Sequence, residues 1–206
     1  MDLSRALDDI KAMRTQMARA TEFRGYGPLT FGLTGLLALA GSVVQWRFIP
    51  IPEREIIAYL WLWSGIAVVA VTMIGVEVVM RSRRVHAGLA TEMVEVAAEE
   101  LLPSIVTGAL LTLVVWRYTP ESVWMLPGLW QILLSLGVFG SCRTLPAPLK
   151  AVGIWYLCTG LACLVFARQN YALSPWAMGV PFGLGEFLAA GLIAITGGRD
   201  EEIEQS

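Results

Sequence analysis

The sequence is poor in charged residues and in the residues that hold metals. Only 16% of its 206 residues are charged and a single one is histidine, whereas soluble domains carry roughly 25% charged residues. The three cysteines show neither CxxC spacing nor a histidine at metal-binding spacing, which argues against zinc or haem ligation. We therefore expect no cofactor and no metal.

Two further absences argue against whole classes of protein. No basic face is present to bind the phosphates of a nucleic acid, because the net charge is −2 and charged residues are largely confined to loops and chain ends. No nucleophile–base pair or phosphate-binding loop is visible, and the pair Gly183 and Gly185 falls inside an apolar stretch instead of after a strand. The sequence therefore predicts neither an enzyme nor a nucleic-acid-binding protein.

What the chain has in abundance is apolar sequence. Apolar residues make up 56% of it, in six stretches close to the ~20 residues that a helix needs to cross a ~30 Å hydrocarbon core. Because lipid offers the backbone no hydrogen-bond partners, each stretch is expected to form an α-helix. The predicted spans are Pro28–Trp46, Ile56–Met80, Leu101–Trp116, Ser122–Cys142, Leu149–Phe166 and Trp176–Gly197. The predicted fold class is an all-α integral membrane protein with six transmembrane helices over residues 28–198.

The distribution of basic residues predicts the orientation of the chain. If all six stretches cross the bilayer, 11 of the 15 lysines and arginines lie on one side and four on the other. The positive-inside rule places the larger group in the cytoplasm. Trp46, Trp116, Tyr171 and Trp176 then fall near the outer interface, where amphipathic rings are enriched. We expect a multi-pass protein of an inner (plasma) membrane with both termini in the cytoplasm.

Three cytoplasmic segments accompany the spans. Residues 1–27 form an arm in which apolar residues recur at helical spacing over Asp2–Ala20, which predicts an amphipathic helix that lies on the inner leaflet or docks a partner. Arg81–Glu100 starts with basic and ends with acidic residues around a helical apolar stripe, so we expect a helical connection there. Residues 199–206 form a short acidic tail.

The two halves of the chain show a weak but ordered similarity. The segment around Pro28 aligns with that around Pro127, Trp61–Ala67 with Tyr156–Ala162, and Pro103 with Pro181. With three spans in each half, a duplication would give the 3+3 inverted repeat of many transporters. Chance alignment of apolar, glycine-rich helices is the competing explanation.

Glu186 is the one ionisable residue near the centre of a predicted span. A charged side chain at mid-bilayer costs roughly 3 kcal/mol on insertion scales and is expected to face the bundle interior or a water-filled cavity. Pro181, Gly183 and Gly185 precede it, so its helix has a weakened hydrogen-bond ladder and little side-chain bulk near the carboxyl. We expect Glu186 to bind a substrate, a cation or a proton, with an interhelical hydrogen bond as the alternative.

Three other polar residues are candidates for the same site. Gln131, in the fourth span, is placed to meet Glu186 across the bundle, and Thr107 lies at a similar depth in the third. Polar residues in spans more often join helices than bind ligands. Glu77 lies about one turn before Met80, where cytoplasmic water or the arginines that follow are within its reach.

These residues support two functions. The first is a small transporter or channel in which the third, fourth and sixth spans line a site around Glu186 and Gln131, completed if necessary by a homo-oligomer. The second is a non-transporting membrane sensor or accessory subunit that docks a cytoplasmic protein through the arm and Arg81–Glu100. A water-accessible cavity at Glu186 would favour the first function, and a dry interior the second.

Overall fold

Each of the six expected spans corresponds to a helix in the computed structural model, which describes residue 13 and residues 27–85, 90–141, 147–167 and 171–204. The helices are α2 (Pro28–Phe48), α3 (Ile56–Val85), α4 (Ala90–Tyr118), α5 (Leu126–Gly140), α6 (Lys150–Phe166) and α7 (Pro175–Glu204). Two short 3-10 helices, η1 (Pro120–Met125) and η3 (Ala147–Leu149), precede α5 and α6. These ranges contain no strand, so the all-α fold is confirmed for the part of the chain they cover.

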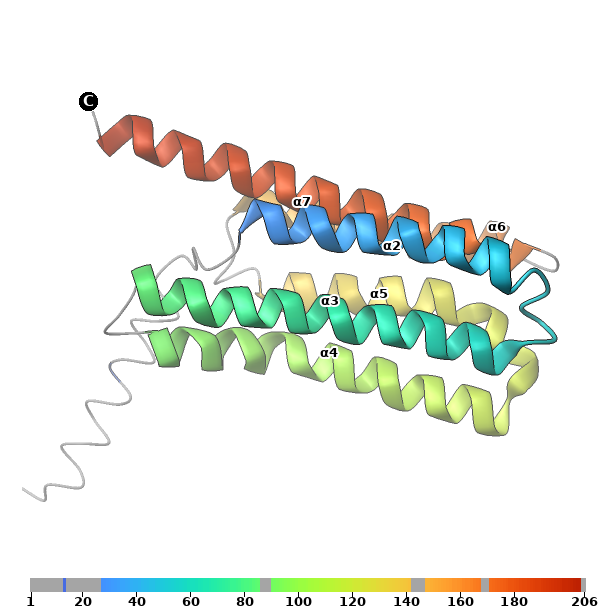
Figure 1. The fold of residues 1–206 in the computed structure, drawn as a ribbon. Helices are drawn as coiled ribbons and strands as arrows, with labels where there is room; N and C mark the ends of the chain where they lie inside the picture. Colours follow the sequence, from blue (N-terminus) through green and yellow to red (C-terminus); the bar gives the residue numbers. More distant parts are fainter. Residues whose placement is uncertain (1–12, 14–26, 86–89, 142–146, 168–170, 205–206) are drawn as a thin grey trace, which may run out of the picture.

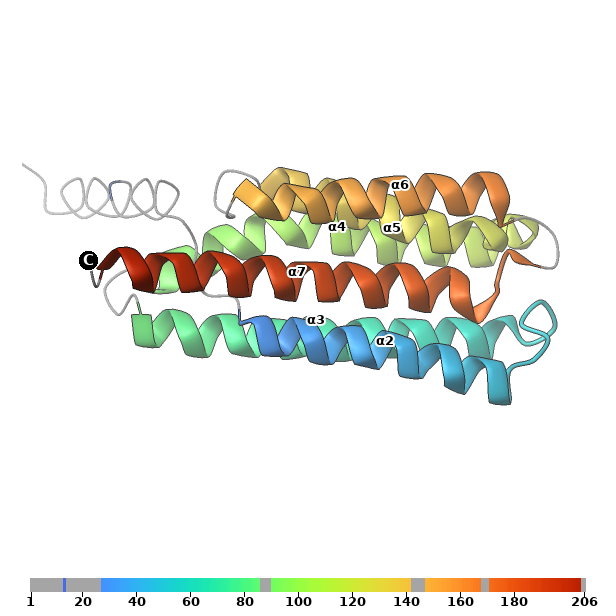
Figure 2. The same cartoon turned by 90° about the horizontal axis from the view of Figure 1, so that it is seen from above.

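The helices form one bundle in which successive helices run in opposite directions along a common axis (Figure 1). The first and last of them, α2 and α7, lie side by side, and α7 lies between α2 and α6 (Figure 2). On the other side of the bundle α3 contacts α4, and α4 contacts α5. The packing of α2 against α7 thus brings residues that are far apart in the sequence into contact.

The outward surface of α3 and α4 is strongly apolar. Trp61 is 76% exposed, Val68 65% and Leu110 58%. Large contiguous apolar patches are rare on soluble monomers, whereas lipid covers such a surface readily. Four helices, together with η1 and α5 as one continuous helical stretch over Pro120–Gly140, are also long and apolar enough to cross a membrane, and α6, with 17 residues, is apolar but shorter. The chain is therefore a membrane-embedded, multi-pass protein.

Glycines allow two pairs of helices to approach closely. A Cβ added at Gly128 of α5 would lie 2.7 Å from the carbonyl oxygen of Gly160 in α6, and a Cβ at Gly160 would lie 2.8 Å from the carbonyl oxygen of Gly128. A Cβ at Gly35 of α2 would lie 3.0 Å from the carbonyl oxygen of Gly183 in α7. Backbone atoms cannot rotate away as side-chain ends do, so these crossings require small residues.

The fourth predicted span begins differently from expectation. The sequence predicts a continuous helix from Ser122, but the chain forms the 3-10 helix η1 first and α5 starts at Leu126. Pro127 gives the physical reason, because its ring would clash with the carbonyl group four residues earlier in an α-helix. The Leu126 N–H instead bonds to the carbonyl oxygen of Val123, three residues back.

The segment expected to connect the second and third spans is divided between two helices. α3 continues to Val85 and α4 begins at Ala90, so both extend beyond their apolar spans, Ile56–Met80 and Ala98–Tyr118. Residues 86–89 lie outside the described part. The amphipathic helix expected over Asp2–Ala20 also lies outside it except for Met13, and residues 199–204 of the expected tail belong to α7.

Candidate functional site

Glu186 lies on α7 close to the middle of the candidate span Pro175–Thr196. Its carboxyl group meets hydroxyl groups from two other helices: Tyr156 Oη of α6 donates to Oε1 at 3.0 Å, and Thr34 Oγ1 of α2 lies 3.1 Å from Oε2. Thr34 is 2% exposed, Tyr156 1%, and Glu186 is partly buried. Within the described ranges no basic side chain pairs with this carboxyl. We call these three residues the Glu186 cluster.

Small residues make the Glu186 cluster possible. The crossing of Gly35 with Gly183 brings α2 against α7, and Thr34 is the neighbour of Gly35. A Cβ at Gly185 would lie 2.5 Å from Cζ of Tyr156 and 2.6 Å from its hydroxyl oxygen. The missing side chain at Gly185 therefore gives the Tyr156 ring the space in which its hydroxyl reaches the carboxyl of the next residue.

The surroundings of the cluster are apolar. Tyr156 belongs to a buried core with Leu149, Val152 and Ala189. Its ring also packs against that of Phe182, with centroids 5.5 Å apart. Hydrogen bonds in such a low-dielectric environment are electrostatically stronger than in water, and an unpaired polar group there is costly. The two hydroxyl contacts are therefore significant for the placement of the carboxyl.

The Thr34 hydroxyl has two acceptors for one proton: the Phe31 carbonyl oxygen at 2.9 Å and Glu186 Oε2. If Glu186 is a carboxylate, Thr34 can donate to only one of them at a time. If Glu186 is a carboxylic acid, Oε2–H donates to Thr34, Thr34 donates to Phe31, and Tyr156 donates to Oε1. Every donor of the cluster then has an acceptor, so the same geometry accommodates one proton.

Gln131 occupies a different place in the bundle. Its Nε2 donates to the carbonyl oxygens of Pro127 at 3.0 Å and Ala177 at 3.1 Å, and lies 3.5 Å from Cys163 Sγ. Ala177 is four residues before Pro181, which has no N–H to complete the helical bond to that carbonyl. Gln131 thus supplies the hydrogen bond that Pro181 cannot make, and none joins it to Glu186.

The other two predicted site residues also lie away from the Glu186 cluster. Thr107 is exposed on α4. Glu77 of α3 lies at the start of α2, where a Cβ on Gly27 would overlap its carboxyl oxygen Oε1. The N-terminal end of a helix carries partial positive charge, so a carboxylate is favourable there. Thr107 and Glu77, like Gln131, are therefore separate from the Glu186 cluster.

Sequence reasoning missed Thr34 and Tyr156, the two residues that contact Glu186. A usable signal for Tyr156 was its position, because it lies in the middle of the predicted span Leu149–Phe166 and not at an interface, where tyrosine is enriched. Thr34 gave only a weak signal, as one hydroxyl beside a glycine in an apolar stretch.

No family model matches the chain, and no curated protein or solved structure matches it either. Functional inference therefore depends on the geometry of the Glu186 cluster itself.

Proposed function

We propose that this protein is a small membrane transporter or channel in which Glu186, with Thr34 and Tyr156, binds a proton during transport. The observation that carries the proposal is a carboxyl group near mid-span that is hydrogen-bonded by two hydroxyls and paired with no basic side chain in the described ranges. Intramembrane carboxyl groups with these properties are typical of proton relays in pumps and transporters.

The presence of glutamate at position 186, where glutamine could also form hydrogen bonds, supports a role in proton exchange. An interhelical tie needs only hydrogen-bonding groups, which glutamine provides without the penalty of an ionisable side chain in hydrocarbon. Glutamate adds the capacity to gain and lose one proton, and the contacts of Thr34 and Tyr156 suit both forms of the carboxyl.

The proposal includes six membrane crossings with both termini in the cytoplasm of a cell with an inner membrane. Support comes from the direction of the chain, since α5 and α7 start at the same end of the bundle and α6 must return the chain between them (Figure 1). The 17 residues of α6 and the three of η3 together rise about 31 Å, close to the hydrocarbon thickness.

We also retain the 3+3 inverted repeat as part of the proposal. In such a duplication α2, α3 and α4 correspond to α5, α6 and α7, in that order. The contact of α2 with α7 should then have a counterpart between α5 and α4, and both contacts exist. Ser42 and Ser141, aligned in the two halves, each bond to the carbonyl oxygen four residues earlier. Such repeats place binding sites near mid-membrane.

Proton flux through purified protein in liposomes tests the function. We expect a membrane potential to drive acidification or alkalinisation of a dye-loaded lumen, and Glu186→Gln to lower the rate at least about tenfold, because the amide cannot release a proton. Glu121→Gln, on an exposed residue in the loop helix η1, is the matched control and should leave the rate unchanged. Equal rates for wild type and Glu186→Gln would contradict the proposal.

A second candidate function is an accessory subunit that docks a cytoplasmic protein. It is supported by the extension of α3 and α4 beyond their apolar spans, to Val85 and from Ala90. This function predicts that reconstituted protein shows no flux above protein-free liposomes. It also predicts that Glu186→Gln alters only thermal stability, which a melting experiment in detergent measures.

A further inference from the structure

Two buried polar atoms have no hydrogen-bond partner in the described part of the chain. They are the hydroxyl oxygen of Tyr59 in α3 and Oε1 of Gln131 in α5. Both residues are 0% exposed. Buried polar atoms in native proteins are almost always paired, and where the protein offers no partner an ordered water often does.

The orientation of the Gln131 amide is fixed by its neighbours. Its Nε2 faces the carbonyl oxygens of Pro127 and Ala177, which are acceptors only. A flipped amide would place Oε1 against these oxygens and lose both bonds. The unpaired atom is therefore an acceptor that requires a donor from elsewhere.

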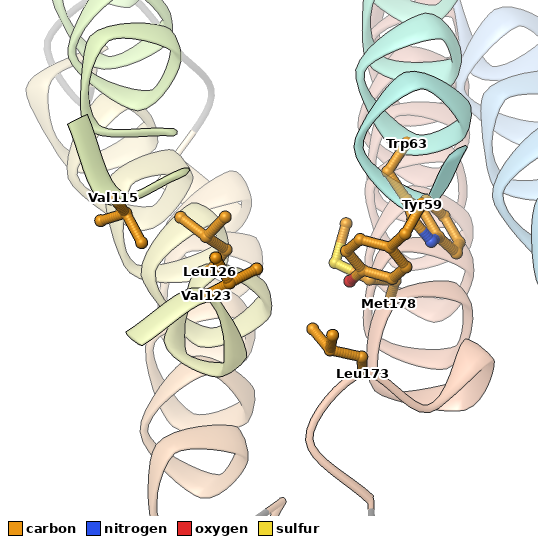
Figure 3. Close-up of a cluster of buried hydrophobic side chains, with 7 residues drawn as sticks. All are labelled: Tyr59, Trp63, Val115, Val123, Leu126, Leu173 and Met178. Carbon is orange, nitrogen blue, oxygen red and sulfur yellow. The ribbon is translucent and has the colours of Figure 1, made fainter. Parts of the chain in front are cut away.

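Tyr59 and Gln131 belong to the same layer of the bundle. Tyr59 packs in a buried cluster with Leu126 and Met178. Leu126 is next to Pro127 in the sequence and Met178 is next to Ala177, and Gln131 binds the carbonyl oxygens of Pro127 and Ala177. Cys163 Sγ lies 3.5 Å from Gln131 Nε2 and 3.6 Å from the carbonyl oxygen of Ala177, which Gln131 also binds. The Tyr59 hydroxyl points away from α3, toward the side on which Leu126 lies (Figure 3).

We propose that Tyr59 and Gln131 bind a buried water molecule in this layer, between α3, α5 and α7. The bound molecule must donate a hydrogen bond to Gln131 Oε1 and also form one with the Tyr59 hydroxyl, and water can do both. The neighbours Leu126, Leu173 and Met178 are apolar, so a bound ion would have no opposite charge beside it, and a neutral molecule is favoured. Ala177 marks the site on α7, nine residues or roughly 13 Å from Glu186, so this water is independent of the proposed function.

Radiolytic hydroxyl-radical labelling of the full-length protein in detergent, read by mass spectrometry, tests the site. Radicals formed from a bound water attack the side chains beside it even when these are buried. We expect Tyr59 to be modified several-fold faster than Tyr156, a tyrosine of equal burial whose hydroxyl is already bonded to Glu186. Equal, background-level modification of the two tyrosines would overturn the proposal.

Thermal stability gives a second, independent readout. If water occupies the site, Tyr59→Phe removes a hydrogen bond, and the Tm should fall by about 2–4 °C. If the hydroxyl is unpaired, Phe removes a desolvated polar group, and the Tm should stay constant or rise. The second result would also overturn the proposal. A failure here leaves the proton-flux experiment on Glu186 unaffected, so the two proposals are tested separately.

Discussion

At the scale of single residues, Tyr156 is held in place from two sides. Gly185 leaves space for its ring and Phe182 packs against it, so its hydroxyl has one position near Oε1 of Glu186. Thr34 is constrained similarly, since its hydroxyl lies between the Phe31 carbonyl and Glu186. The carboxyl group therefore lies between two hydroxyl groups that are already in place, and under the proposed function it needs no large movement to gain or lose a proton.

The Tyr156 contact predicts an energetic coupling to Glu186. Tyr156→Phe removes the donor to Oε1, and we expect it to destabilise the protein by about 1 kcal/mol, the usual scale of hydrogen bonds between membrane helices. In the Glu186→Gln background the same change should have a different effect, because its partner is altered. A double-mutant cycle measured by unfolding in mixed micelles checks this, and strictly additive effects would show that the two side chains do not interact.

At the scale of elements, the antiparallel pair α5 and α6 depends on the crossing of Gly128 with Gly160. We expect Gly160→Ala to destabilise the protein by about 1–3 kcal/mol, because the new methyl would lie 2.8 Å from a backbone oxygen. Gly65→Ala, in α3, is the matched control, since a Cβ there meets nothing within 4 Å. This control should be neutral or slightly stabilising through helix propensity. Equal melting temperatures for the two variants would mean that the crossing is not close.

Element positions could be predicted well from the sequence, whereas the contacts of the site could not. The span Ile56–Met80 agrees with the prediction, because the length and apolar character of a membrane span can be read from the residues of that span alone. The partner of Glu186 depends on which helix lies against α7, and Thr34 is 152 residues away in the sequence. The bond between Gln131 and Ala177 likewise requires knowing that α5 faces the carbonyl released by Pro181.

At the scale of the whole molecule, the proposed topology predicts the exposure of the loops. In a variant without the native cysteines, a cysteine at Arg54 or Glu121 should react with a membrane-impermeant thiol reagent in intact cells. A cysteine added at Ser206 should react only after the membrane is opened. The loops of Arg54 and Glu121 join α2 to α3 and α4 to α5 at one end of the bundle. Labelling of Ser206 in intact cells would contradict the proposed orientation.

The contact between α2 and α7 has a consequence for biosynthesis. Because α2 is synthesised before α7, the Thr34 hydroxyl has the Phe31 carbonyl oxygen as an acceptor before Glu186 is present. The Glu186 cluster therefore cannot form in a nascent or truncated chain that lacks α7. If Glu186 binds a proton as we propose, a chain whose synthesis stops before α7 is complete cannot carry protons through this site.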